Sequence, residues 1–383
     1  MKTEVLTAEI LAYLDGVKEE TIALIETLCR IPAPSHLEDK RAKFVEEWLK
    51  NQGADGVYID GAKNVVYPVG CENKKDIVLF CAHTDTVFPD TDEMPFSRDD
   101  EYLYSPGVGD DTTCLAVMLM VAKYVAQNKL TAPCGILFVA NSCEEGLGNL
   151  KGIKQIMQDY AGRIRRVYTF DGEYDALVVK CVGSHRYELT LTTEGGHSFG
   201  NFGNRNAIVA AAKLICKLNE CDIPQKSAGK TTFNVGLISG GTSVNTIAQS
   251  AKFCYEYRSD MREDLQKMQQ FFLSCVEQAR KEKWAEIAVE TLGERPCGGE
   301  VDQDELQEMI TSAVEISEKH SGISCKQTSG STDCNIPMSL GVPAVCVGSF
   351  LGAGAHTREE KVRIDSIPVG LKIAFELILG YFI

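Results

Sequence analysis

Short apolar runs that alternate with helical patterns limit the fold of this chain more than any other feature. Three of the runs span residues 76–82, 134–140 and 167–170, and a helical pattern at 112–126 lies between the first two. Runs that are apolar on both faces and are separated by helices are typical of a parallel sheet covered on both sides. The sequence therefore predicts an α/β fold, with a mostly parallel sheet and helices on both faces.

The two ends of the chain have helical patterns of their own. Residues 7–29 carry apolar residues at helical spacing, which predicts one helix. Ser35, with Glu38 three residues later, has the pattern of a capping box at the start of a second helix, which Gly53 would end. The apolar segment 367–383 is too short to span a bilayer comfortably and is predicted to form an amphipathic surface helix.

The pattern changes in the middle of the chain. Apolar residues alternate with polar ones around residues 187–191 and 253–257, which predicts half-exposed strands, and amphipathic helices are predicted at 206–219 and 262–283. We therefore expect a small α+β domain at 182–294. It would be inserted between two parts of the α/β domain, 1–181 and 295–383, the second of which contains a strand at 344–347.

Charge and cysteine content exclude several classes of protein. The formal net charge of −15 repels nucleic acid and anionic membranes, so neither is an expected partner. Residues 1–15 lack the apolar core of a signal peptide. The fifteen cysteines are odd in number and contain no C-x-x-C, which favours reduced, buried thiols in a cytoplasmic protein over a disulfide framework.

Potential metal ligands gather in four segments, three of which directly follow an apolar run. They are His83 and Asp85, Asp110 and Asp111, Glu144 and Glu145, and Asp171 and Glu173. Each pair alone could be a surface turn, a helix cap or solvated acids. Because the carboxyl ends of parallel strands meet at one edge, the pairs together would repel one another without a multivalent cation. A late His356 adds a second imidazole, and this mixture suits zinc, cobalt or manganese.

The order of these motifs resembles the M20 metallopeptidase family over essentially the whole chain. The motifs are H-x-D at His83, G-x-G-D-D at Gly107, E-E-G at Glu144, Asp171, G-G-H-S at Gly195 and the late His356. The resemblance implies a zinc-exopeptidase-like fold and a two-metal hydrolase that cleaves an amide bond in di- or tripeptides. An N-acyl amino acid deacylase remains an alternative, and a catalytically inactive, ligand-binding relative is a more distant one.

The resemblance also implies roles for individual residues. Asp110 would bridge two divalent ions, most simply zinc, and the remaining metal ligands would be His83 and Asp171 at one ion and Glu145 and His356 at the other. Asp85 would orient His83, and Glu144 would be the general base that takes a proton from the attacking water and delivers it to the leaving amine. A cis peptide bond is expected between Asp110 and Asp111.

The inserted domain resembles the lid and dimerisation domain of that family, which implies a homodimer. His197 would stabilise the oxyanion, often from the partner subunit, although a core or capping role is the plainer alternative. Asn245 and Arg258 would hold the substrate carboxylate, although an Arg that ends a strand is commonly a salt-bridge partner. The loop 329–333, with Gly330 and Asp333, matches a segment that lines the substrate.

Several other residues are given ordinary roles. Cys143 is adjacent to the acids but has no catalytic His or Asn partner in the sequence pattern, so we do not expect a nucleophile there. The remaining histidines are expected to be surface or packing residues; they are His36, His185 and His320. The chain departs from the family pattern at Phe88, Glu173 and Ala355, none of which removes a ligand type.

Overall fold

The chain forms two compact units. The computed structural model describes residues 5–222 and 229–383, and it assigns Met1–Lys180 and Glu300–Ile383 to a larger unit and Cys181–Gly299 to a smaller one. The boundaries expected from the sequence lie close to these, although the last strand of the smaller unit, β14 (Glu286–Arg295), ends one residue beyond the expected second boundary.

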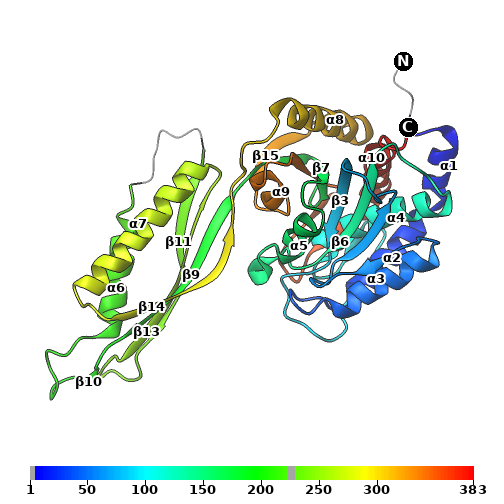
Figure 1. Ribbon diagram of the computed structural model, residues 1–383. Coiled ribbons are helices and arrows are strands. Elements are labelled where there is room, and N and C mark those ends of the chain that lie inside the picture. Colours follow the sequence, from blue (N-terminus) through cyan, green and yellow to red (C-terminus); the bar gives the residue numbers. More distant parts are fainter. Residues whose placement is uncertain (1–4, 223–228) are drawn as a thin grey trace. The chain divides into compact units, whose positions relative to one another are not determined.

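An eight-stranded sheet forms the centre of the larger unit (Figure 1). In spatial order its strands are β1 (Tyr58–Ile59), β2 (Val65–Val69), β6 (Gly135–Asn141), β3 (Ile77–His83), β7 (Ile164–Phe170), β16 (Ala344–Val347), β8 (Ala176–Cys181) and β15 (Lys326–Gly330). The strands β6, β3, β7 and β16 are parallel, whereas β1, β2 and β8 pair antiparallel. The prediction of a mostly parallel sheet is therefore confirmed.

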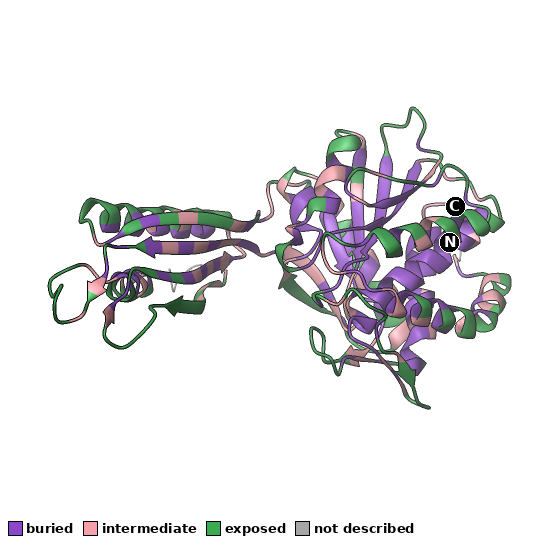
Figure 2. Ribbon diagram, turned by 90° about the horizontal axis from the view of Figure 1, so that it is seen from below, coloured by how far each residue is buried: buried purple, intermediate pink, exposed green. Residues whose placement is uncertain are grey.

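The central strands are apolar on both faces because both faces are covered. Every residue of β3 and β6 is buried, and Figure 2 shows the central strands of the sheet in the colour of buried residues. The helices of this unit are α1 (Ala8–Gly16), α2 (Lys18–Arg30), α3 (Asp39–Asn51), α4 (Cys114–Gln127), α5 (Lys151–Asp159), α8 (Gln303–Ser321), α9 (Asn335–Ser339) and α10 (Ile367–Leu379). Helix α4 packs on β3, and α5 and α9 lie on the other side of the sheet (Figure 1).

Two helix predictions are wrong in their details. The segment 7–29 forms two helices rather than one, since α1 ends at Gly16, a poor helix former, and α2 begins at Lys18. The last helix, α10, is not a surface helix, because it packs against both α4 and α8 and most of its residues are buried. Within the described residues, no helix combines the length and the apolar character needed to cross a membrane.

The larger unit also contains a second, smaller sheet. Its four short strands, in spatial order, are β17 (Gly352–Ala353), β18 (Lys361–Arg363), β5 (Tyr102–Tyr104) and β4 (Ser97–Arg98). All three pairings are antiparallel, so β17 and β18 form a hairpin that β5 extends. The sequence did not predict this sheet, because strands of two or three residues have too few positions to show a period.

The smaller unit is an antiparallel sheet with two helices on one face. Its strands, in spatial order, are β11 (Thr231–Gly240), β13 (Ser250–Ser259), β9 (Gly183–Thr192) and β14. Helices α6 (Ala207–Asn219) and α7 (Arg262–Lys281) pack on each other and on β13. The alternating residues of β9 and β13 face these helices, and they include Tyr187 and Tyr255, whose rings stack on Phe272.

Candidate metal centre

The carboxyl ends of three neighbouring parallel strands bring the predicted ligands together. His83 is the last residue of β3, Asp171 follows β7, and Glu145 lies four residues after the end of β6. Since β3 lies between β6 and β7 in the sheet, the loops that follow these strands emerge side by side. The side chains of His83 and Glu145 are almost completely buried there.

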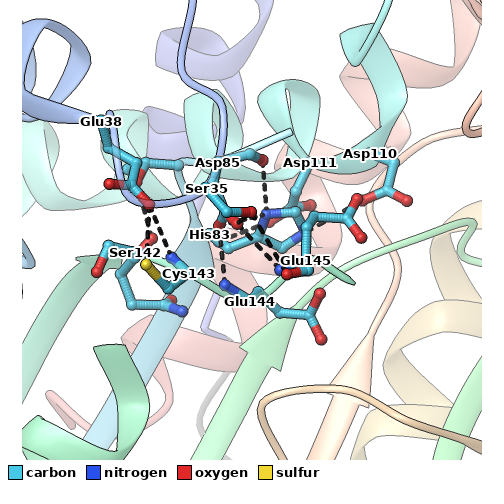
Figure 3. A network of polar contacts seen from close by, with 12 residues as sticks. Ser35, Glu38, His83, Asp85, Asp110, Asp111, Ser142, Cys143, Glu144 and Glu145 are labelled. Atoms are coloured by element: carbon cyan, nitrogen blue, oxygen red, sulfur yellow. Dashed lines mark hydrogen bonds and ion pairs between the residues drawn. The ribbon is translucent and has the colours of Figure 1, made fainter. Parts of the chain in front are cut away.

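Asp110 lies between the two imidazoles. Its Oδ1 atom is 3.0 Å from Nε2 of His83, and its Oδ2 atom is 3.0 Å from Nε2 of His356. The same Nε2 atom of His356 is 3.1 Å from Oε1 of Glu145. A carboxylate with one oxygen toward each imidazole has the arrangement that a bridging ligand between two ions requires. Figure 3 shows Asp110 with His83 and Glu145.

A second group of donor atoms includes Asp111, which the sequence resemblance assigned to neither ion. Donor atoms of His83, Asp111 and Asp171 lie within 4.8 Å of one another, as do those of His83, Asp110 and Glu145. Asp111 Oδ2 accepts a hydrogen bond from the main-chain N–H of His83 at 2.8 Å. Its Oδ1 atom is buried and has no hydrogen-bond partner in the described part of the chain. The sequence grouped Asp111 with the potential ligands, but the resemblance gave it no ion to bind.

The proton affinities of these groups are strongly perturbed. Burial, reinforced by Asp110, raises the pKa of Asp171 to about 7. Hydrogen bonds to Asp110 and Glu145 raise the pKa of His356 to about 10. Burial alone would lower the pKa of His83, but the surrounding acids raise it well above its usual value. Acids and imidazoles whose proton affinity is raised in this way are a donor set that divalent ions fit, because a bound cation can replace those protons.

The peptide bond between Asp110 and Asp111 is cis, as predicted. It lies in the irregular helical turn Val108–Thr113, which leads directly into α4. The turn thereby presents two successive carboxylates to the site, Asp110 toward the imidazoles and Asp111 toward the end of β3.

Asp85 has a broader role than the one predicted for it. Nδ1 of His83 lies 3.0 Å from the main-chain carbonyl oxygen of Asp85 and 3.6 Å from its carboxylate, so the carbonyl is the closer partner of the imidazole. The fully buried carboxylate instead accepts hydrogen bonds from the main-chain N–H groups of Glu144 (2.9 Å) and Glu145 (3.0 Å). Ser35 donates a third hydrogen bond at 2.6 Å. Asp85 therefore holds the chain that carries both acids (Figure 3).

Replacing Asp85 with Asn is expected to weaken this loop. The NH₂ group of Asn would face the main-chain N–H of Glu144 or of Glu145 and leave that buried donor without an acceptor. The loss would lower the free energy of unfolding by about 1–3 kcal/mol. Urea denaturation of the metal-free protein measures this loss. Ser35→Ala is the matched control, because it removes one hydrogen bond and leaves both main-chain bonds in place. If Asp85→Asn were no less stable than Ser35→Ala, the carboxylate would not be holding the loop.

The predicted capping box at Ser35 and Glu38 is wrong. Helix α3 begins at Asp39, and its N-cap, Glu38, makes no side-chain capping bond. Glu38 instead accepts hydrogen bonds from the main-chain N–H groups of His36 (2.9 Å) and Cys143 (3.1 Å). The side chains of Ser35 and Glu38 do form hydrogen bonds, but not with the first turn of α3: Ser35 donates to Asp85, and Glu38 accepts from the nearby His36 and the distant Cys143. Ser35, through Asp85, and Glu38, through Cys143, therefore support the loop after β6 that carries Glu144 and Glu145, which we call the Glu144 loop.

Cys143 does have a histidine neighbour, contrary to the expectation from the sequence. Nδ1 of His36 lies 3.4 Å from its sulfur, and the thiol donates to Glu38 at 3.1 Å. Burial and this bond raise the pKa of Cys143 to about 12. A thiol held protonated in this way is a poor nucleophile, so the structure gives Cys143 a packing and hydrogen-bonding role.

The loop after β15 contacts the end of β6. Gly330 ends β15 and lies beside Val178. Asp333 accepts a hydrogen bond at 2.6 Å from Nδ2 of Asn141, the last residue of β6. The structure therefore brings Asp333 next to the strand that carries the Glu144 loop.

The remaining predicted residues lie in the smaller unit, in two separate places. His197 is in β10 (Gly196–His197), which pairs with β12 (Thr246–Ile247), and Ser198 donates to the carbonyl of Asn245 at 3.0 Å. Nδ1 of His197 accepts from two main-chain N–H groups, which leaves Nε2 to carry the proton. Arg258 forms an ion pair with Glu256 near the last residue of β13. Asn245 precedes the first residue of that strand, Ser250, and the strand rises about 26 Å between Ser250 and Arg258. His197 and Asn245 thus lie together, and Arg258 lies apart from them.

Comparison with known proteins places the chain in a family. Residues 79–380 match the model of peptidase family M20/M25/M40. A succinyl-diaminopimelate desuccinylase of Corynebacterium glutamicum is 24% identical over 91% of this chain and 93% of its own length. A tripeptidase of Staphylococcus aureus has the same fold, with a TM-score of 0.76 and 22% identity over 95% of this chain and 98% of the other.

A Bacillus subtilis protein described as a dinuclear metal-binding peptidase of the M20 family also shares the fold. Its TM-score is 0.66 at 15% identity, and the match covers 95% of this chain and 98% of that one. Since the family model spans most of the 383 residues and includes all five predicted ligands, this chain belongs to peptidase family M20/M25/M40.

Proposed function

We propose that the protein is a two-metal exopeptidase that hydrolyses an amide bond in di- and tripeptides. The observation that carries this proposal is the Asp110 carboxylate, which lies 3.0 Å from each of two imidazoles, with Glu145 beside the second. His83 and Asp171 would hold one divalent ion, Glu145 and His356 the other, and Asp110 both. Zinc, cobalt or manganese suits this mixture of nitrogen and oxygen donors.

Glu144 is the proposed general base. When bound, the two ions would polarise the scissile carbonyl and lower the pKa of the attacking water. Glu144 is buried at the same loop as Glu145, and Asp85 fixes the main-chain N–H groups of both. Its carboxylate would accept a proton from the water and deliver it to the leaving amine. The partner subunit's His197, whose Nε2 carries a proton, would donate a hydrogen bond to the oxyanion. The partner subunit's Asn245, together with Arg258 and Gly330 of the first subunit, would contact the substrate.

A deacylase is the second candidate. It is favoured by the relative from Corynebacterium glutamicum, whose name describes removal of a succinyl group from an amino acid. The same metal centre would serve both reactions, because each attacks an amide carbonyl. The leaving amine and the acyl part therefore distinguish them.

A matched substrate panel tests the two functions. The purified protein, reconstituted separately with zinc, cobalt and manganese, is incubated with di- and tripeptides, their amino- or carboxyl-blocked forms, and N-succinyl and N-acetyl amino acids. Mass spectrometry then identifies the products. Release of single residues from free peptides is the expected result, and cleavage of N-acyl amino acids alone would establish the deacylase. No cleavage with any metal would favour an inactive, ligand-binding relative.

A homodimer through the smaller unit is also proposed. Exposed apolar side chains occur at the end of the edge strand β11, in the loop after it and on α6, and we call them the apolar strip: Leu237, Ile238, Val244, Ile208 and Val209. Leu237 and Ile238 point to opposite faces of β11, yet they are 69% and 60% exposed, so neither face is covered there. Apolar edge strands invite pairing with another chain.

We also propose that the protein is cytoplasmic, which the fifteen free thiols support.

Two lysines in the apolar strip are expected to dissociate the dimer. Leu237→Lys combined with Ile238→Lys would bury charge in an apolar interface and raise the dimer dissociation constant about 100-fold or more. Light scattering after size exclusion measures the mass. Leu273→Lys, at an exposed position of α7, is the control and should leave the dimer intact. A double variant that stays dimeric would place the interface elsewhere.

A further inference from the structure

The hairpin of β17 and β18 carries two residues that meet the Asp110 turn. His356 lies on the connection between the strands, and Glu360 follows four residues later, immediately before β18. Strand β18 pairs with β5, and the chain leaves β5 for the turn that contains Gly107, Gly109 and Asp110. His356 is a proposed metal ligand, whereas Glu360 has no role in the proposed reaction.

The Glu360 carboxylate accepts three hydrogen bonds from one turn. Oε2 accepts from the main-chain N–H of Gly107 at 2.7 Å, and Oε1 accepts from Gly109 at 3.0 Å and from Asp110 at 2.8 Å. Converging main-chain N–H groups of this kind form a concavity that favours an anion. Here the anion is a side chain of the protein, and Glu360 is only 2% exposed.

The close approach depends on glycine. A Cβ atom at Gly109 would lie 2.8 Å from Oε1 of Glu360 and 2.7 Å from the Phe350 ring, and Gly107 has a φ of 74°. A side chain at Gly109 would therefore push the carboxylate away from the turn. Gly107 and Gly109 are the two glycines of the G-x-G-D-D motif, so the contact with Glu360 explains why this chain has glycine at those positions.

A second contact anchors the other side of the hairpin. Arg358 forms a two-pronged ion pair with Asp90, at 2.6 and 3.0 Å, and its guanidinium lies 5.1 Å from the centre of the Phe88 ring. This anchor is exposed, whereas the Glu360 contact is buried and reaches the turn that carries Asp110. The Arg358 contact reaches Asp90, which is not a proposed ligand. The Glu360 contact directly joins the hairpin that carries His356 to the turn that carries Asp110.

We propose that Glu360 is a positioning residue of the metal centre. Its carboxylate ties the turn that presents Asp110 to the hairpin that presents His356, and so holds these ligands at their 3.0 Å separation before an ion binds. The inference rests on the proposed two-metal function, because it assigns a task to that site. Without this contact, Asp110 and His356 could move apart, and the affinity for the ion that both would bind would fall.

Zinc titration of Glu360→Gln tests the proposal. In Gln one oxygen becomes an NH₂ group, which must face at least one of the three N–H donors. The zinc dissociation constant, measured by competition with a chromophoric chelator, is expected to rise about 10–100-fold for at least one of the two ions. Glu359→Gln removes the same charge at the exposed neighbouring position and should bind zinc like the wild type.

The outcomes separate this inference from the proposed function. Two tight zinc ions in both the wild type and Glu360→Gln would overturn the inference and leave the function standing. A wild type that binds no ion would remove both. A purely structural role would lower the unfolding midpoint of the chelated variant without changing its zinc affinity, which also overturns the inference.

Should Glu360→Gln not fold, hydrogen exchange of the chelated wild type decides the question. The amides of Gly107, Gly109 and Asp110 are expected to be protected together by the Glu360 carboxylate. Rapid exchange at all three would show that the contact does not form in solution and would overturn the proposal.

Discussion

Glu144→Gln is expected to lower kcat by a factor of about 10²–10⁴, the range that a general acid–base group contributes. Gln keeps the size of the side chain but cannot take a proton from water at neutral pH. The main-chain hydrogen bond from residue 144 to Asp85 does not involve the side chain, so the loop should keep its geometry. Metal content should therefore stay at the wild-type value.

Steady-state kinetics on the best substrate of the panel, with metal content measured on the same samples, checks this expectation. Glu72→Gln, an exposed position of the larger unit, is the control for the Glu-to-Gln change itself. A Glu144→Gln protein with full metal and unchanged kcat would show that another group moves the proton. A loss of metal together with activity would instead make Glu144 a ligand.

The core of the fold could be predicted because burial leaves a direct trace in sequence. Strands β3 and β6 are buried at every position, so their residues form unbroken apolar runs up to the terminal His83 and Asn141, and β16 spans the residues expected for it. The ligands at the ends of β3 and β7 follow from that placement, since a parallel sheet gathers its carboxyl ends at one edge.

What the sequence missed depends on contacts between distant segments. Ser35 and Glu38 have the spacing of a helix cap, but Ser35 donates to Asp85 and Glu38 accepts from Cys143, both far along the chain. Asp111 and Glu360 carry no local signal, because their hydrogen bonds go to the main chain of other segments. The last helix reads as amphipathic because Lys372 and Glu376 interrupt it, yet Glu376 is paired with Lys319 on α8. Local periodicity does not report such pairings.

Removing metal is expected to destabilise the larger unit. Asp110, Asp111, Glu145 and Asp171 lie around His83, and the raised pKa of Asp171 reflects both its burial and repulsion from Asp110. Divalent ions would replace repulsion among these carboxylates with attraction. At 1,000 times the dissociation constant, an ion that binds only the folded state adds about 4 kcal/mol of unfolding free energy.

Thermal unfolding of the chelated protein, with ions added back one at a time, measures this effect. Zinc, cobalt and manganese should raise the unfolding midpoint more than calcium, because imidazole nitrogen is a poor ligand for calcium. In Asp110→Asn the rise should be largely lost, since one change weakens both proposed ion sites. Equal rises in the variant and the wild type would mean that the ions bind elsewhere, and the bridging role of Asp110 would then be wrong. A rise with calcium as large as that with zinc would point to an all-oxygen site and would remove His83 and His356 from the ligand set.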